Sequence, residues 1–435
     1  MTPAEAHSSV TAPHLAAAAR GDAPRVGVLG DGQLARMMAP AAVELGIELR
    51  LLAGSADSSA GQVIPRTTLG DYRSVEDVLA FADDVDVITF DHEHVPAEVL
   101  TALIDQGTAL HPGPDALHYA QDKLAMRRAV EELGLPNPRW AEVHSVEELV
   151  GFGEETGWPV VLKTPRGGYD GKGVRIITSA ETAVQAQDWF DRAAAQHTGL
   201  LAEEKVPFTR ELSAQVARSA LGEIRAYPVV ESNQAHGVCD EVIAPAPHSH
   251  PTHMEDAASI ARLIAERLAV TGMLAVELFE IAEGERAGVY VNELAMRPHN
   301  SGHWSMDGAV TGQFEQHLRA VLGLPLGSTA PIAGPGSRTV MKNLFGASAP
   351  NLHAGVPDAA RHLPESRIHL YGKEPRPGRK VGHVNVVLAP EPGEPAVAAG
   401  ELQRARQAAA RAAELITETT AARPHHDEGT GTDGR

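Results

Sequence analysis

The sequence predicts an α/β protein of several domains, the first of which is built on a doubly wound parallel sheet. With 435 residues, the chain is too long for one hydrophobic core, so two to four domains are expected. Strand and helix patterns alternate over the first hundred residues, an order typical of a parallel sheet with helices on both faces. Strands are expected at residues 25–29, 47–53 and 85–90, and helices at 34–45, 74–81 and 96–104.

Proline, glycine and capping residues mark where elements and domains end. Ser74 and Asp77 resemble a capping box, and Pro96 lies in the first turn of the third helix. After residues 112–114 the pattern changes to hairpin-like strands with longer helices, and Pro and Gly near 325–336 mark a second boundary. Further helices are expected at 121–133, 181–195, 254–270 and 397–416, strands at 158–162, 174–177, 273–279 and 289–293, and a strand-rich segment at 338–388. The expected domains are 24–120, 121–330 and 331–417, between disordered tails at 1–23 and 418–435.

Composition and charge exclude several classes of protein. The net charge of −20 argues against nucleic acid or an anionic membrane as a general partner, so an anionic substrate needs a local basic pocket. The single cysteine, Cys239, excludes an intramolecular disulfide and suits a reducing cytoplasm. A small buried residue is the favoured interpretation of Cys239, and a nucleophile is the alternative. No apolar run approaches the ~20 residues of a transmembrane helix, and residues 1–23 do not resemble a signal peptide.

The segment Lys163–Gly173 is the most informative part of the sequence. It lies between two strand patterns and holds four glycines in seven positions, so its backbone N–H groups can approach an anion closely. It does not match the Walker pattern, and no helix signal follows directly. We therefore expect a phosphate-binding loop of a nucleotide-using enzyme, with an ordinary glycine-rich hairpin loop as the alternative.

A second glycine turn, Gly30–Ala35, follows the first strand. It fits the dinucleotide pattern G-x-G-x-x-A, but the end of the second strand, Arg50–Ala53, offers no acid for a ribose hydroxyl. A site for a substrate phosphate, or a purely structural turn, is therefore favoured over NAD binding. The segment Asp91–His94 follows another parallel strand, where it either contacts a ligand or caps the next helix.

Two glutamates in an expected hairpin suggest a metal site. If the hairpin is symmetric about residue 285, Glu277 lies opposite Glu293, and like charges at ~5 Å are unfavourable. A cation between them removes that conflict, and carboxylates with an Asn and phosphate oxygens suit Mg²⁺. Asn292 would have to act from a bulge or from the strand end. The alternative is a pair of solvated glutamates.

The segment Arg297–Trp304 follows the second glutamate directly. His299 and His303 could hold zinc if they lay on a helix. Pro298 and Gly302 argue against a helix, so a polar loop facing the substrate is favoured.

The segment Lys373–Lys380 carries four cations in eight residues of an otherwise acidic chain. Its two prolines restrict the backbone, and arginine can bind phosphate through two hydrogen bonds. A phosphate pocket is expected, and a solvated charged loop is the alternative.

Taken together, these motifs resemble a known family. Lys163 with its glycine loop, residues 201–206, Glu277 and Asn292–Glu293 resemble the ATP-grasp superfamily. Within it, four strings are similar to those of the N5-carboxyaminoimidazole ribonucleotide synthases of purine biosynthesis: residues 30–34, 167–173, 292–304 and 373–383. The resemblance covers about residues 24–416. Biotin carboxylases and D-Ala–D-Ala ligases share the ATP site but not the final basic motif.

The resemblance implies a three-domain ATP-grasp ligase. Such an enzyme joins bicarbonate to 5-aminoimidazole ribonucleotide at the expense of ATP, by way of carboxyphosphate. It also implies Mg²⁺ as cofactor, a cytoplasmic location and a homodimer.

The resemblance assigns a role to each residue that matches a family motif. ATP would be bound by Lys123, Lys163, Gly168, Tyr169, Asp170, Gly171, Lys172, Gly173, Val174, Glu203, Glu204, Lys205, Val206, Glu211, Gln234, Asn292 and Glu293. Mg²⁺ would be bound by Glu277 and Glu293. The ribonucleotide would be bound by Gly32, Gln33, Leu34, Glu93, Asn300, Lys373, Arg376, Arg379 and Lys380. The groups nearest the reacting amine and bicarbonate would be Asp170, Arg297, Lys373 and Arg379.

The sequence departs from the family pattern at two positions. Many relatives carry His beside the nucleotide where this chain has Gln234, and Asp91 stands where Glu is common. Three alternatives stay open: another ATP-grasp ligase, an NAD-dependent dehydrogenase built on the Gly30 turn, and a catalytically silent ATP-binding regulator. The intact Lys163, Glu277 and Glu293 weigh against the last.

Overall fold

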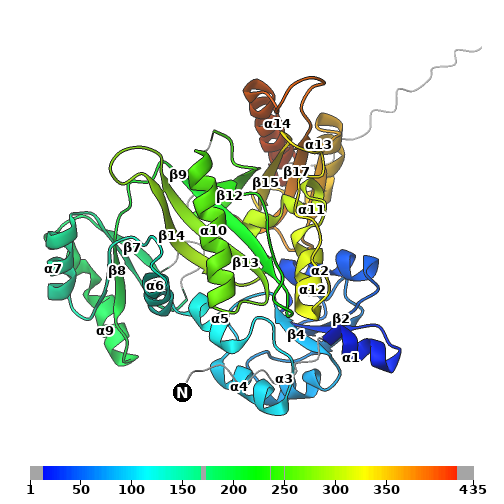
Figure 1. The fold of residues 1–435 in the computed structure, drawn as a ribbon, viewed down its shortest axis with the longest axis horizontal. Coiled ribbons are helices and arrows are strands. Elements are labelled where there is room, and N and C mark those ends of the chain that lie inside the picture. Colours follow the sequence, from blue (N-terminus) through cyan, green and yellow to red (C-terminus); the bar gives the residue numbers. More distant parts are fainter. Residues whose placement is uncertain (1–12, 168–172, 236, 249, 419–435) are drawn as a thin grey trace, which may run out of the picture.

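The computed structural model describes residues 13–418 except 168–172, 236 and 249 (Figure 1). Residues 1–23 were expected to be disordered, but Pro13–Arg20 form helix α1. The buried side chain of Ala17 and a hydrogen bond between the ring of His14 and the carbonyl of Leu322 hold this helix to the body. Residues 1–12, and all but the first residue of the tail expected at 418–435, lie outside the described range.

The first sheet is parallel, which confirms the predicted doubly wound architecture. Its strands lie in the order β3–β2–β1–β4, with bounds Arg66–Leu69 for β3, Glu48–Ala53 for β2, Arg25–Leu29 for β1 and Val87–Phe90 for β4. The helices that follow these strands are α2 (Gln33–Glu44), α3 (Val75–Ala82) and α4 (Ala97–Gln106). One face packs against α2 and a helix from far along the chain, α12 (Gln313–Leu322). The other face packs against α3 and α4.

The predicted capping box at α3 forms only in part. Ser74 Oγ accepts a hydrogen bond from the backbone N–H of Asp77. The Asp77 carboxylate, however, accepts from the N–H of Asp71, so the reciprocal bond to Ser74 is replaced by one to the preceding loop.

The helix expected at residues 121–133 is α6, Lys123–Glu132, and a further helix precedes it, α5 at Pro114–Gln121. Asp122 separates the two helices. It has an extended backbone, and its side chain accepts hydrogen bonds from two N–H groups in the first turn of α6. An N-cap of this kind fixes where the helix begins.

The central sheet is antiparallel and continues across the domain boundary expected near residue 330. Its strand order is β14–β13–β9–β11–β12–β15–β17–β16, with β10 paired to β9. The bounds are β9 Arg210–Arg218, β10 Ile224–Ala226, β11 Val230–Ala235, β12 Val238–Ala244, β13 Gly272–Ile281, β14 Gly288–Ala295, β15 Arg338–Phe345, β16 Arg367–Leu370 and β17 Lys380–Leu388. Helix α10 (Pro251–Arg267) covers one face of the first half. The pairing of β12 with β15 joins the two halves into one hydrogen-bonded ladder.

The last helix, α14 (Ala399–Glu418), covers β15 and β17 together with α13 (Val356–His362). Short helical segments lie between these elements. They are η2 (Asn300–Gly302) and α11 (Ser305–Gly308), between β14 and α12, and η3 (Leu352–Ala354), between β15 and α13.

A small antiparallel sheet forms a separate subdomain, at the left of Figure 1. Its strand order is β5–β8–β6–β7, with bounds Trp140–Val143, Leu200–Glu204, Val160–Lys163 and Val174–Ile177 respectively. Helices α7 (Val146–Thr156) and α9 (Gln187–Ala195) pack on it. The single helix predicted at 181–195 is wrong, because the segment divides into α8 (Ala180–Ala183), the turn η1 (Val184–Ala186) and α9.

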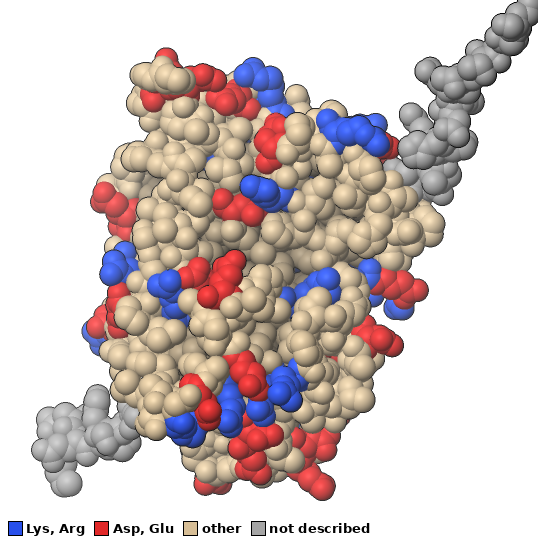
Figure 2. All heavy atoms as spheres, turned by 90° about the vertical axis from the view of Figure 1, so that its right-hand side faces the viewer, with Lys and Arg blue, Asp and Glu red and all other residues tan. Residues whose placement is uncertain are grey.

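Charged side chains are mixed over the face drawn in Figure 2, where acidic and basic residues alternate in small groups. Among the described helices, none combines the length and the apolar character that crossing a bilayer requires.

Candidate active site

Two opposed glutamates lie on one face of the central sheet. Glu277 of β13 pairs directly with Glu293 of β14, which confirms the predicted register. The register then shifts, so that Leu278 pairs with Val291 and Asn292 is the extra residue of a β-bulge. The bulge that the sequence left as one of two possibilities for Asn292 is therefore present.

The protein around Glu277 opposes its negative charge. Burial and the nearby carboxylates of Glu293 and Glu211 raise the pKa of Glu277 to about 8, while Lys380 and Arg297 act in the opposite direction. Burial also raises the pKa of Glu211 to about 7, against the charge of Lys163. Burial and like charges thus disfavour the ionised forms of both carboxyl groups. A bound cation would favour the ionised forms instead, so this place suits a cation.

Two lysines from other elements reach the strand segment Asn292–Glu293. Lys163, at the end of β6, places its Nζ 2.7 Å from Glu203 Oε2 and 3.5 Å from Asn292 Oδ1. Lys123, the first residue of α6, places its Nζ 3.6 Å from Glu293 Oε1 and donates to the carbonyl of Gly167. Lys123 thus stands beside Glu293, and Lys163 stands beside Asn292, the neighbour of Glu293 in the bulge. Of that loop, residues 168–172 lie outside the described part of the structure.

The oxygens at this place fit Mg²⁺ if phosphate oxygens complete its shell. Glu277, Glu293 and the side-chain oxygen of Asn292 are hard ligands of the kind that Mg²⁺ prefers. Within the residues that the structure describes, no three or more His, Cys, Asp or Glu side chains are grouped to hold a metal alone. That finding also gives no support to zinc at His299 and His303.

The strand end Glu203–Val206 leads from the small subdomain into the central sheet. Neighbouring side chains there point to opposite sides: Glu203 pairs with Lys163, whereas Glu204 pairs with Arg139 and, at 2.7 Å, with Arg286. Burial raises the pKa of Glu203, but Arg127 and Lys163 outweigh it and hold that pKa at about 2.

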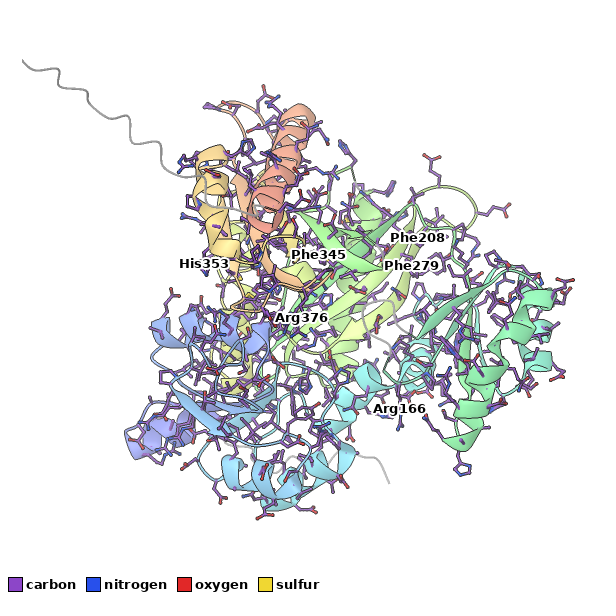
Figure 3. The ribbon with its side chains drawn as sticks, turned by 180° about the vertical axis from the view of Figure 1, so that it is seen from behind. Arg166, Phe208, Phe279, Phe345, His353 and Arg376 are labelled. Carbon is purple, nitrogen blue, oxygen red and sulfur yellow. The ribbon has the colours of Figure 1, made fainter. Side chains whose placement is uncertain are left out.

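An aromatic pair that sequence reasoning missed follows this strand end. The rings of Phe208 and Phe279 stack with centroids 4.6 Å apart, beside the junction with the small subdomain (Figure 3). Phe279 pairs across the strands with Glu211, so both lie on the same face of the sheet. The two phenylalanines are 71 positions apart in the sequence, and only the fold brings them together.

The glycine turn of the first sheet holds a protein carboxylate. Asp91 accepts a hydrogen bond from the N–H of Gly32 at 2.5 Å. A Cβ on Gly30 would lie 2.3 Å from Asp91 Oδ1, and one on Gly32 would lie 2.5 Å from Oδ2. Both glycines are therefore needed for the close approach of Asp91, an anion placed where a dinucleotide phosphate would bind. Burial raises the pKa of Asp91 to about 6, despite that hydrogen bond and the charges of Arg297 and Lys373.

The expected substrate residues meet between the first sheet and the C-terminal segment. Lys373 donates a short hydrogen bond to Gln33 Oε1, and Arg297 Nε lies 2.8 Å from Glu93 Oε1. Asn300 Oδ1 is buried and is one of the described side-chain atoms without a hydrogen-bond partner. These two contacts join distant parts of the chain, and the charges of Arg297 and Lys373 both act on Asp91.

Other predicted residues lie farther from these contacts. Arg376 pairs with Glu374 at 2.7 Å, and both side chains are about 70% exposed. Figure 3 shows Arg376 where the C-terminal segment faces the first sheet. Arg379 is also exposed and donates to the carbonyl of Glu374. Gln234 donates to Ser232 within its own strand, β11, and the described hydrogen bonds do not join it to Lys163 or Glu211.

Comparison with known proteins agrees with this arrangement. Residues 128–314 match the family described as the ATP-grasp domain, residues 24–121 the ribonucleotide synthetase preATP-grasp domain, and residues 339–391 the phosphoribosylaminoimidazole carboxylase C-terminal domain. Fold and site thus define an ATP-grasp ligase.

Curated relatives narrow the class. The chain is 50% identical over 367 residues to N5-carboxyaminoimidazole ribonucleotide synthase of Corynebacterium ammoniagenes, covering 83% of this chain and 87% of that one. It is 47% identical over 368 residues to the synthase of the same name from Mycobacterium bovis, covering 83% of each. The chain therefore belongs to the N5-carboxyaminoimidazole ribonucleotide synthase family.

Solved structures share the whole architecture. The synthetase from Thermus thermophilus superimposes with a TM-score of 0.76 at 35% identity, covering 91% of this chain and 99% of that one. The Aspergillus clavatus synthase, in complex with ADP and 5-aminoimidazole ribonucleotide, gives a TM-score of 0.78 at 28% identity, covering 91% and 98%.

Proposed function

We propose that this protein uses ATP to carboxylate 5-aminoimidazole ribonucleotide with bicarbonate, giving N5-carboxyaminoimidazole ribonucleotide, ADP and phosphate in purine biosynthesis. The observation that carries the proposal is the meeting of Lys373 with Gln33. It joins the basic C-terminal segment to the glycine turn of the first sheet. Lys380 of the same segment acts electrostatically on Glu277 and so connects the segment to the glutamate pair. A second candidate is an ATP-grasp ligase of the same fold with a different acceptor.

The ATP phosphates would be held by Lys123 and Lys163. Mg²⁺, bound by Glu277 and Glu293 with Asn292 beside them, would neutralise charge on the phosphate oxygens. Phosphoryl transfer needs mainly positioning and charge stabilisation, so cations and donors fixed before the reaction supply most of the catalysis. The ion pair of Lys163 with Glu203 and its contact with Asn292 fix one such cation in advance.

Two steps complete the reaction. A bicarbonate oxygen attacks the γ-phosphorus, and the bond to the bridging oxygen of ADP breaks to give carboxyphosphate. The amine of the ribonucleotide then attacks the carboxyl carbon, or CO₂ released from carboxyphosphate, with loss of phosphate and of one amine proton. Carboxyphosphate hydrolyses readily, so the site must exclude water. From the family resemblance, the loop 168–174 would exclude water and Asp170 would lie near the amine.

The ribonucleotide would lie between Gly32–Leu34, Glu93 and Lys373. The ion pair between Arg297 and Glu93 holds a guanidinium beside one of these residues, Glu93. Although burial has the larger effect on both groups, the positive charge of Lys380 acts to lower the pKa of Glu277 and of His299, so its amine lies near both side chains. Lys373 and Lys380 are the stronger candidates for substrate contacts. Arg376 and Arg379 are exposed here and would contact only the rim.

For the nucleotide base we propose the backbone of Glu203–Val206, and for the ribose hydroxyls Glu211. For the chain as a whole we propose domains at 24–120, 121–330 and 331–417, a homodimer, and a cytoplasmic location. Sedimentation analysis tests the dimer directly.

The decisive experiment measures ADP release with Mg-ATP and bicarbonate, with and without freshly made 5-aminoimidazole ribonucleotide, while the free amine is followed in parallel. Strong stimulation with equal loss of amine supports the proposal. Folded protein that binds Mg-ATP but shows no stimulation would overturn the acceptor and favour the second candidate.

A further inference from the structure

The guanidinium of Arg127 lies buried behind the proposed phosphate site. Arg127 belongs to α6 and has 0% of its surface exposed. Its Nε donates to Glu203 Oε1 at 2.5 Å, and its Nη1 donates to Asn137 Oδ1 at 2.8 Å and to the carbonyl of Val291 at 2.6 Å. Its Nη2 donates to the carbonyl of Asn292 at 2.9 Å. A buried arginine with this many matched acceptors is strongly held, because leaving any of them unpaired is costly.

These hydrogen bonds close a ring through the site. Glu203 uses one carboxylate oxygen for Arg127 and the other for Lys163. Lys163 donates to the side-chain oxygen of Asn292. The backbone carbonyl of Asn292 accepts a hydrogen bond from Arg127, which closes the ring. The ring therefore couples a proposed ATP-phosphate lysine to the strand segment that carries the proposed metal ligand Glu293.

The bulge explains why a guanidinium is required. Successive carbonyls of a regular strand point to opposite edges, yet those of Val291 and Asn292 both bind Arg127. The extra residue of the bulge allows both to face the same side. β14 is the terminal strand of the sheet, so an outward carbonyl there lacks a ladder partner. A planar fork of donors can satisfy both carbonyls and Glu203 at once, whereas a lysine has a single nitrogen.

We propose that Arg127 is a positioning residue for Mg-ATP. By fixing Glu203 and the bulge together, it sets the distance between the Lys163 amine and the oxygens of Asn292 and Glu293. Arg127 touches neither substrate nor metal itself. The inference rests on the proposed ATP-binding function and does not depend on which acceptor is carboxylated.

The chain offers a matched control in Arg286. That guanidinium also joins the strand end of the small subdomain to the β13–β14 hairpin, through its bidentate pair with Glu204. It lies on the side away from Glu203 and Lys163, because side chains of adjacent strand residues point to opposite faces. Loss of either arginine removes a link between the same two elements, but only Arg127 is part of the ring.

The test compares Arg127→Lys with Arg286→Lys by calorimetric titration of Mg-ADP and by the Mg²⁺ concentration that half-saturates ADP binding. For Arg127→Lys we expect Mg-ADP to bind at least tenfold more weakly and the half-saturating Mg²⁺ to rise. For Arg286→Lys both quantities should stay within about twofold. Wild-type Mg-ADP binding in Arg127→Lys, or equal weakening in the two variants, would overturn the proposal.

Two further measurements keep the result interpretable. If Arg127→Lys does not fold, Asn137→Ala removes one of its supports and should weaken Mg-ADP binding severalfold, and no weakening would count against the proposal. The KM for the ribonucleotide should be unchanged in folded variants, since Lys373 and Gln33 are not in the ring. If the wild type binds Mg-ADP normally but shows no ribonucleotide-dependent turnover, the proposed reaction is wrong. The comparison of Arg127→Lys with Arg286→Lys still tests the positioning role of Arg127.

Discussion

Replacing Glu277 by Gln should stabilise the metal-free protein. Gln resembles the protonated carboxyl group and removes the charge that burial, Glu293 and Glu211 oppose. The unfolded chain releases the proton of Glu277 near pH 4.5, whereas the folded chain holds it until about pH 8. The folded state therefore binds more protons between these values, and its stability falls as pH rises through them.

The magnitude follows from the same two values. Because the unfolded chain ionises Glu277 while the folded chain keeps it protonated, this residue lowers the stability by about 1 kcal/mol at pH 5.5 and about 3 kcal/mol at pH 7, as an upper figure, since each pKa unit corresponds to about 1.4 kcal/mol. About a fifth of the side chain is exposed, and solvent screening lowers these figures. Glu277→Gln should therefore have a higher melting temperature than wild type, with a difference that grows from pH 5.5 to pH 8.

Thermal unfolding in EDTA, repeated with Mg-ADP, is the assay. Glu280→Gln is the matched control on the same strand, because Arg210 and His253 outweigh burial and lower the pKa of Glu280. That variant should be destabilised at every pH in this range. Mg-ADP should raise the melting temperature of wild type more than that of Glu277→Gln. If Glu277→Gln is less stable than wild type, or the difference does not change with pH, Glu277 does not face uncompensated negative charge.

Three other variants probe separate parts of the site. Glu293→Ala should abolish ATP turnover while far-UV circular dichroism stays native, and turnover at ordinary Mg²⁺ concentrations would refute the metal assignment. Lys373→Ala should raise the KM for the ribonucleotide by ~10-fold or more, the value of one charge-assisted hydrogen bond, with the KM for ATP unchanged in steady-state kinetics. A change confined to ATP would refute that role. Gly30→Ala should cost more than about 2 kcal/mol in chemical unfolding, since its Cβ would lie 2.3 Å from Asp91. Gly46→Ala, also at positive φ but with open space around it, should cost only about 1 kcal/mol. Equal costs would show that the contact with Asp91 is unimportant.

The sequence was sufficient where local patterns decide the structure. The parallel sheet followed from the alternation of strands and helices, and the pairing of Glu277 with Glu293 followed from the spacing of one hairpin. Both features are set by residues close together in the sequence, and periodic patterns of apolar and polar residues predict such local structure.

Interactions between distant segments were not predicted. Arg127 lies in an ordinary amphipathic helix pattern, and its partners are 10 to 165 residues away. Glu203 and Glu204 were expected to bind ATP, but their side-chain partners Arg127, Lys163, Arg139 and Arg286 could not be read from spacing. The helix predicted at 181–195 failed for a local reason: the apolar pattern hid the turn η1, which follows the short helix Ala180–Ala183 that Ser179 caps.

The continuous central sheet has a consequence for how the molecule unfolds. Because β12 and β15 share one ladder, the C-terminal strands cannot separate from the ATP-binding strands without breaking backbone hydrogen bonds. The small sheet β5–β8–β6–β7 has no ladder bond to the central sheet among the described residues. Hydrogen exchange should therefore report one cooperative unit from β9 to β17 and a second unit that opens at lower free energy. A subdomain that opens on its own can admit and release a nucleotide while the rest of the protein stays folded.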